Sequence, residues 1–202
     1  KLMATLRRIL SIDEEDAASR EELVECLVRQ GDPEAVQTER IALAQLYRKQ
    51  GKGEDALNQY HRILEKSPFN MKVICEAAEL PGQTGQPEAA IQFYLEQAKT
   101  LDRLGAKPEA EQLLQRALKI APERPETLEH LADLYRRMER PAQALEHLEQ
   151  LASRAAEQNR IADAIRHLND ALQIEPGRSD LIVQMAEYHE REQQPGKAAE
   201  YW

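Results

Sequence analysis

Small and apolar residues recur along the chain at a spacing of 54 residues. The repetition is clearest in three sets of residues: Ala44, Ala98 and Ala152; Ala56, Ala110 and Ala164; Leu64, Leu118 and Leu172. Small side chains at matched places let the axes of successive helices approach closely, which buries a seam without a large central core. The pattern therefore predicts a stack of similar helical units.

Each unit is predicted to contain three helices. The first is long, over about 33–50, 87–104 and 141–158, the second covers about 53–66, 107–121 and 161–175, and the third about 71–80, 125–139 and 179–193. The units themselves span about 33–86, 87–140 and 141–194, with partial units at both ends of one array over residues 1–202. Because both ends fall inside a unit, we expect the chain to be a fragment of a longer array or to pair end to end.

Proline positions support these boundaries. Seven of the ten prolines occupy two phases of the same period, namely Pro33, Pro87, Pro141 and Pro195, and Pro68, Pro122 and Pro176. Proline is tolerated in the first turn of a helix or after its end and is rare in the interior. The first set is therefore predicted to open the long helices, and the second set to follow the second helices.

One predicted helix departs from the pattern. Pro81 and Gly82 stand where the later units have Tyr135-Arg136 and His189-Glu190. This pair predicts that the third helix of the first unit ends about one turn early, before a looser turn over residues 81–86. The turn is interpreted as a tolerated loop variation, with a hinge or a lip on a binding face as the alternative.

Composition and charge favour an all-helical stack and restrict its partners. Aromatic residues make up only 4% of the chain, the formal net charge is -9 and the pI is about 5.2. Binding to phosphates requires clustered lysine and arginine, so a general nucleic-acid or anionic-membrane surface is not expected, although a local basic groove stays open. No apolar stretch approaches the roughly 18 residues that cross a bilayer, and no signal peptide is recognised. We expect a cytoplasmic protein, with the periplasm open if the chain is a fragment.

Residues that could carry chemistry are scattered. The histidines fall singly on predicted helices, outside any HExxH-type pair, and are interpreted as surface residues: His61, His130, His147, His167 and His189. Cys26 and Cys75 fit neither a metal motif nor a disulfide framework. The chain lacks GxxxxGK[ST], GxGxxG and GxSxG motifs. We therefore predict no catalytic site, no metal and no cofactor.

Residues 37–70 form a stretch that, counted from Gln37, holds Ala44, Tyr47, Gly51, Ala56, Tyr60 and Pro68 at positions 8, 11, 15, 20, 24 and 32. These are signature positions of the tetratricopeptide repeat, which the stretch therefore resembles. Two positions depart from the signature, with Arg40 where an aromatic is usual and Ile63 where alanine is usual. The resemblance implies an all-α, right-handed solenoid of tandem helical hairpins, and the handedness comes from the resemblance alone. The long helix serves two overlapping repeat registers.

The resemblance also implies that the first helix of each pair lines a concave groove through positions 2, 5, 9, 12 and 13. Its candidate partner-binding residues are Gln45, Arg48, Lys49, Lys99, Arg103, Arg136 and Arg137. The later registers present mostly acids at these positions, and the last long helix has Glu146, Glu149 and Ser153 there. A lysine and asparagine clamp for a C-terminal carboxylate, known in the family, is absent because those positions hold other residues, such as Ile41 and Gln45. An ordinary mixed-charge surface is the alternative.

A second candidate surface is a ladder of rings. Phe93, His147 and Tyr201 share one phase of the period, and the fourth copy is Glu39. Since a glutamate is tolerated there, the phase is predicted to be incompletely buried. The rings would stack on an extended ligand or on a neighbouring array, and the alternative is partial burial between adjacent helices.

The sequence therefore predicts a non-catalytic scaffold or adaptor that holds a peptide or partner protein in a preformed groove. One alternative is a self-assembling platform, a homo-oligomer formed through repeat ends or faces. A further alternative is the regulatory arm of a larger enzyme. The identity of the partner is not encoded in any motif of the chain.

Overall fold

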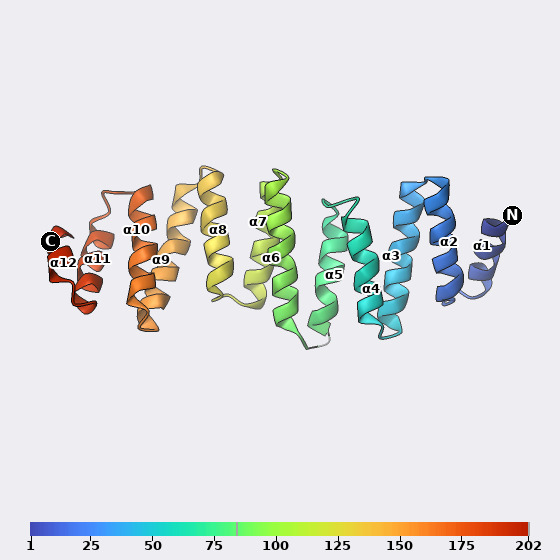
Figure 1. Ribbon diagram of the computed structural model, residues 1–202, viewed down its shortest axis with the longest axis horizontal. Helices are drawn as coiled ribbons and strands as arrows, with labels where there is room; N and C mark the ends of the chain where they lie inside the picture. Colours follow the sequence, from blue (N-terminus) through green and yellow to red (C-terminus); the bar gives the residue numbers. More distant parts are fainter. Residues whose placement is uncertain (84, 202) are drawn as a thin grey trace. The chain divides into compact units, whose positions relative to one another are not determined.

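The computed structural model describes residues 1–83 and 85–201, and within them the chain is built from helices (Figure 1). The predicted all-α class is confirmed, and no strand occurs in these two ranges. The helices are α1 (Leu2–Ile12), α2 (Ala17–Gln30), α3 (Pro33–Lys49), α4 (Gly53–Leu64), α5 (Met71–Gln83), α6 (Pro87–Arg103), α7 (Lys107–Ile120), α8 (Pro125–Arg137), α9 (Pro141–Glu157), α10 (Ile161–Ile174), α11 (Ser179–Arg191) and α12 (Pro195–Tyr201).

The long helices begin at the predicted prolines. Pro33, Pro87 and Pro141 are the first residues of α3, α6 and α9, and each of these helices has 17 residues. Proline suits this place because its fixed φ is already helical and its missing N–H would have no partner within the helix. At α3 the preceding Asp32 completes the start, since its side chain accepts a hydrogen bond from the backbone N–H of Ala35 at 3.0 Å.

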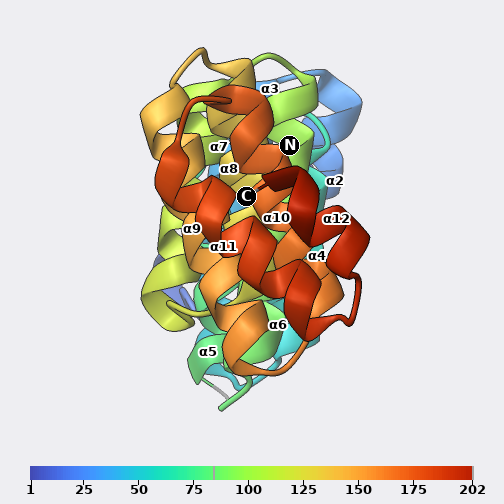
Figure 2. The ribbon, with the colours of Figure 1, turned by 90° about the vertical axis from the view of Figure 1, so that its left-hand side faces the viewer.

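The chain divides into two compact units, residues 1–109 and 110–202. In unit 1, successive helices pack on one another from the pair α1 and α2 to the pair α5 and α6. In unit 2, successive helices do so from the pair α8 and α9 to the pair α11 and α12. Figure 2 shows the last pair, α11 and α12, side by side and nearest to the viewer. A single array over residues 1–202 and the boundaries of its three-helix units stay predictions.

Buried alanine and leucine residues form the core of each unit. In unit 1, a cluster of Leu6, Leu10, Leu23 and Leu27 joins α1 to α2. In unit 2, a cluster joins α8, α9, α10 and α11 through residues that include Leu128, Leu148, Leu168 and Met185. The alanines predicted at helix crossings, Ala44, Ala98 and Ala152, are no more than 2% exposed. Burial of these small side chains is what allows neighbouring helices to pack closely.

The residues that follow the third helices share a left-handed conformation. Gly31, Gly85, Glu139 and Gln193 lie 54 residues apart, and their φ angles are 79°, 76°, 57° and 57°. A left-handed residue after a helix satisfies its last carbonyl groups, and glycine adopts this conformation without steric cost. Glu139 and Gln193 therefore hold a strained conformation that the two glycines adopt freely.

The predicted early end of the third helix in the first unit is wrong. The helix α5 runs through Pro81 to Gln83, which is the same phase as the ends of α8 and α11. Proline removes only one backbone donor, and so close to the helix end that loss does not stop the last turn. The Pro81 carbonyl accepts a hydrogen bond from the Gln86 N–H at 2.9 Å, which closes the turn. Residue 84, within the predicted looser turn, lies outside the described residues.

Candidate functional site

The predicted basic and polar groove residues are mostly exposed. On α3, Arg48 and Lys49 are exposed in the last turn, and Gln45 is half-buried with its side-chain amide 3.4 Å from Glu76 Oε2. On α6, Lys99 and Arg103 are exposed. All five lie in unit 1, whereas Arg136 and Arg137 are exposed on α8 of unit 2. Six of the seven candidate side chains are therefore at the surface.

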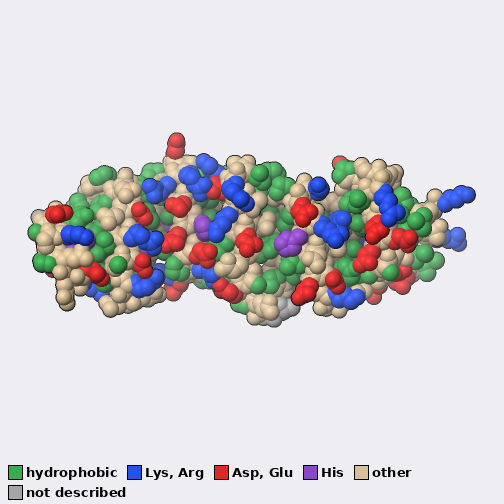
Figure 3. All heavy atoms as spheres, viewed as in Figure 1, with side chains coloured by type: hydrophobic (Ala, Val, Ile, Leu, Met, Phe, Trp, Pro, Cys, Tyr) green, Lys and Arg blue, Asp and Glu red, His purple; other side chains and the backbone are tan. Residues whose placement is uncertain are grey.

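The predicted groove face is not polar throughout. Leu95 occupies the same register face of α6 as Lys99, yet it is fully buried at 0% exposure. Figure 3 shows lysine and arginine side chains interspersed with aspartate and glutamate on the face that it presents. Mixed charge of this kind carries little specificity by itself, so the shape of the surface has to distinguish a site from ordinary solvated helix.

A hollow of about 450 Å³ marks such a place in unit 2, between α9 and α11. It is lined by Glu146, Glu149, Gln150, Ser153, Gln184 and Tyr188. Glu146, Glu149 and Ser153 occupy positions 2, 5 and 9 of the repeat register on α9, which are three of the positions that the family resemblance assigns to a groove. Sequence reasoning identified these positions but selected only basic residues and Gln45 as candidates.

The hollow between α9 and α11 has an acidic wall. Glu149 Oε1 lies 3.0 Å from Nη2 of Arg178, which also holds Asp180 through two short hydrogen bonds. That contact lowers the pKa of Asp180 to about 2. Glu146 is exposed and has no hydrogen bond or ion pair to any residue in the described ranges. Its carboxylate is therefore available to a cationic group in the hollow.

The predicted ladder rings each contact a ring from their own unit. Phe93 meets His61 edge to face with ring centroids 5.7 Å apart. His147 stacks on Tyr135, and Tyr201 stacks on His189, at 5.7 and 5.6 Å. His147 and Tyr201 are half-buried, in line with incomplete burial of the phase, but Phe93 is only 8% exposed.

The exception at Phe93 has a local cause. Tyr135 and His189 stand one period apart, and the equivalent residue of unit 1 is Pro81, which offers no aromatic ring. Phe93 therefore turns to His61 of α4 and is covered by it. Stacking of the rings on an external ligand stays a prediction, and it would have to use edges that these internal contacts leave open.

Two histidines lie in the interior, contrary to the expectation of surface residues. His167 and His189 are 5% and 6% exposed. His189 is covered by its stacked partner Tyr201, and His167 stands at the 54-residue phase of the buried Leu113. The polar sequence around His189 gives no sign of this burial, whereas His167 lies between Ile165 and Leu168 on a more apolar helix.

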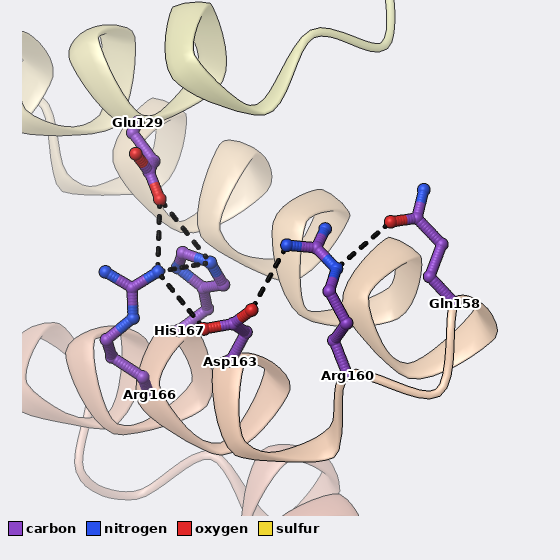
Figure 4. A network of polar contacts seen from close by, with 6 residues as sticks. All are labelled: Glu129, Gln158, Arg160, Asp163, Arg166 and His167. Atoms are coloured by element: carbon purple, nitrogen blue, oxygen red, sulfur yellow. Dashed lines mark hydrogen bonds and ion pairs between the residues drawn. The ribbon is translucent and has the colours of Figure 1, made fainter.

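His167 belongs to a polar network that links α8 to α10 (Figure 4). Arg166 Nη2 lies 3.2 Å from an oxygen of Glu129 on α8 and 3.7 Å from an oxygen of Asp163 on α10. His167 Nε2 is 3.7 Å from Glu129 Oε1. Burial, followed by the positive charge of Arg166, lowers the pKa of His167. The His167 to Glu129 distance is too long for a hydrogen bond. This network ties helices together and lacks the close base geometry of a catalytic pair.

Neither a metal cluster nor a membrane span occurs in the two described ranges. No group of three or more histidine, cysteine, aspartate or glutamate residues there is arranged to hold a metal ion. None of the helices in those ranges combines the length and apolar character needed to cross a bilayer.

These features define a protein built from repeated helical hairpins. Residues 41–125 match one family model of the tetratricopeptide repeat and residues 127–181 match another, so together they cover more than two thirds of the chain. The chain belongs to the tetratricopeptide repeat family. The fold is therefore a helical solenoid, and its class is that of protein-interaction scaffolds, generally without catalytic activity.

Solved structures with a similar fold are distant in sequence. A tetratricopeptide repeat protein from Parabacteroides merdae is 16% identical with a TM-score of 0.37, and the match covers 99% of this chain and 90% of that one. The human IFIT1 dimer with PPP-AAAA is 13% identical with a TM-score of 0.38, covering 99% and 57%. A crystal structure of MamA is 17% identical with a TM-score of 0.30, covering 78% and 89%. A comparison with curated protein sequences found no match.

Proposed function

We propose that the chain is a non-catalytic adaptor that binds an extended segment of a partner protein along the first-helix faces of its repeats. The observation that carries this proposal is the hollow between α9 and α11. It is lined by Glu146, Glu149 and Ser153, three residues that the repeat register assigns to a groove. Tyr188 of α11 completes the lining on the opposite side. A rigid hollow loses little conformational entropy when it binds a peptide.

Charge indicates the chemistry of the segment that unit 2 would bind. Glu146 is an exposed carboxylate without an internal partner in the described ranges, and it stands beside Glu149 in the lining. A lysine or arginine side chain of the partner would gain a charge-assisted hydrogen bond there. In unit 1 the corresponding first-helix faces present Arg48, Lys49, Lys99 and Arg103, which favour acidic residues of the partner.

A site-specific cross-linking experiment tests the unit 2 site. A benzophenone side chain placed at Ser153, inside the hollow, should capture a protein from a native lysate, and the same group at the exposed Glu187 of α11, outside the hollow, should not. Glu146→Lys should reduce capture at least tenfold, whereas the matched reversal Glu187→Lys should leave it unchanged. Equal capture from both positions would show that the hollow is not a binding site.

The basic residues of unit 1 have their own test. Lys99→Glu combined with Arg103→Glu should remove a partner that binds this face, and Arg7→Glu with Arg8→Glu on exposed α1 is the matched control. Retention of the partner by the first variant would exclude Lys99 and Arg103 from the interface. If the chain captures only other copies of itself, the self-assembling platform replaces the adaptor.

A further inference from the structure

A cleft in unit 1 runs along α3, between α2 and α4. Two hollows of about 430 and 700 Å³ share Val28, Arg40 and Arg62, so they join into one depression, which we call the α3 cleft. Val28 comes from α2, Arg40 from the floor on α3, and Arg62 from α4. Neither Val28, Arg40 nor Arg62 belongs to the groove positions chosen from the family resemblance on α3 and α6.

The α3 cleft exists where the repeat departs from its usual packing. Arg40 stands 54 residues before Tyr94 and 108 before Leu148, which are 6% and 5% exposed. Its contact Gln59 stands at the phase of Leu113 and His167, which are also buried. Arg40 and Gln59 therefore occupy places that the later copies of the 54-residue repeat fill with well-buried side chains.

This polar pair keeps the site open to water. Arg40 Nη1 donates a hydrogen bond to Gln59 Oε1 at 2.9 Å, and both residues are only half-buried. A guanidinium resists full desolvation, so it does not seal the space between α3 and α4 as Tyr94 or Leu148 seals theirs. The departure from the repeat signature at Arg40 thus creates a concave polar surface.

Two positive charges converge in the α3 cleft without a carboxylate of their own. No carboxylate in the described ranges comes within ion-pair distance of Arg40 or Arg62. Burial and then the charge of Arg62 lower the pKa of Arg40, and Glu65 opposes this only as the smallest influence. A bound anion would relieve this repulsion.

Three of the five carboxylates that line the α3 cleft accept hydrogen bonds. Glu25 accepts a hydrogen bond from Arg29 at 3.1 Å, Glu21 accepts one from the Tyr47 hydroxyl, and Asp32 caps the start of α3. Glu34 lies in the first turn of α3, where the helix dipole favours a negative charge. The exposed Glu65 also lines the cleft and acts on Arg40 through its charge. Arg40 and Arg62 are thus guanidinium groups that form no ion pair within 4.0 Å with the described residues.

The walls of the α3 cleft are held in place. Arg20 of α2 forms a 2.8 Å ion pair with Glu39 of α3, and both side chains are at most 24% exposed. At the other wall, Ser67 just beyond α4 donates a hydrogen bond to Gln37 of α3 at 3.1 Å. A cleft whose walls are already fixed binds a ligand with less ordering cost than a flexible surface.

We propose that the α3 cleft is a second docking site, which binds an acidic side chain of an extended segment from a partner protein. Arg40 and Arg62 hold the carboxylate, because guanidinium groups donate paired hydrogen bonds to it. The exposed Val28 and the half-buried Val36 contact the apolar side chains that flank the carboxylate. The site is independent of the hollow between α9 and α11, so it does not rest on the adaptor groove proposed above.

Fluorescence anisotropy with a short fluorescein-labelled peptide of alternating aspartate and leucine tests this site on the whole chain. The peptide should bind, and its asparagine counterpart should bind at least tenfold more weakly. Arg62→Gln should weaken binding of the acidic peptide about tenfold, and Arg40→Gln with Arg62→Gln should abolish it. The matched control, Arg7→Gln with Arg8→Gln on α1, should leave it unchanged.

A second variant separates binding from folding. Arg40→Tyr introduces the residue that stands at the equivalent place 54 residues later, Tyr94. It should raise the urea midpoint of unfolding and abolish binding of the acidic peptide. Because Arg62 is exposed, Arg62→Gln should retain the wild-type circular dichroism spectrum. The proposal is overturned if the unsubstituted chain does not bind the peptide, if the asparagine peptide binds equally well, or if Arg62→Gln and Arg40→Tyr both bind normally.

Discussion

The Tyr60 hydroxyl donates a hydrogen bond to Glu76 Oε2 at 2.9 Å, joining α4 to α5 in the interior of unit 1. Tyr60 is 0% exposed, and the Glu76 side chain is 18% exposed. The same carboxylate oxygen receives the Gln45 amide from α3 at 3.4 Å. Glu76 of α5 therefore receives contacts from two other helices, and the contact from α3 is made by a predicted groove residue.

Removing the Tyr60 hydroxyl should destabilise unit 1. Tyr60→Phe leaves the Glu76 carboxylate without its buried donor, and hydrogen bonds to charged groups contribute about 1.5–3 kcal/mol. We expect the free energy of unfolding, measured by urea denaturation at neutral pH, to fall by about 1.5 kcal/mol. A loss within experimental error would mean that water replaces the hydroxyl at no cost.

The same tyrosine predicts an alkaline limit of stability. Burial, reinforced by the hydrogen bond to Glu76, raises the pKa of Tyr60 well above its usual value of 10.0. Above pH 10 the unfolded chain loses the phenolic proton first, so the folded state binds more protons and stability decreases as pH rises. Tyr60→Phe should show a shallower decrease above pH 10, and an identical decrease in both proteins would contradict this assignment.

Stability of unit 2 should decrease in mild acid because of His167. Its pKa lies below the ordinary 6.5, so the unfolded chain takes up a proton first as pH falls. The free energy of unfolding should therefore decline as pH is lowered from neutral through 6.5, until the folded histidine is protonated too. His167→Leu, which copies the residue at the Leu113 phase, should remove this part of the slope in urea titrations at several pH values. An unchanged slope would assign the effect to other groups.

Phe93 should behave as a core residue. At 8% exposure and with His61 against its edge, Phe93→Ala should lower the free energy of unfolding by about 3–5 kcal/mol. His61→Ala, which removes the exposed partner ring, should cost only about 1 kcal/mol. Chemical denaturation followed by circular dichroism measures both losses. A small loss for Phe93→Ala would instead indicate a ring available to a ligand.

The left-handed residue after α8 offers a stabilising substitution. Glu139→Gly should relieve about 1–2 kcal/mol of steric strain at φ 57°, offset by about 0.5–1 kcal/mol of extra entropy in the unfolded chain. The matched control Glu146→Gly, at an exposed helical position on α9, should cost about 1 kcal/mol. Urea midpoints that move in opposite directions confirm the conformational argument, and two equal losses contradict it.

Much of the candidate site could be anticipated from the repeat register. Glu146, Glu149 and Ser153 were placed on one face by their spacing, and that face lines a hollow against α11. The α3 cleft could not be anticipated in this way. Arg40 was visible as a departure from the signature, but the convergence of Arg62 and the contact with Gln59 depend on how α4 packs across α3.

The sequence by itself determined where the long helices begin and which small residues meet between helices. Proline at the first turn and alanine at helix crossings act through local backbone geometry and side-chain size, so their 54-residue spacing could be read directly. Only the tertiary structure decided that α5 continues through Pro81, that Phe93 pairs with His61, and that His167 is buried. These outcomes depend on which side chains neighbouring helices bring together, because burial and pairing are set by contacts between elements and not by the preference of one residue.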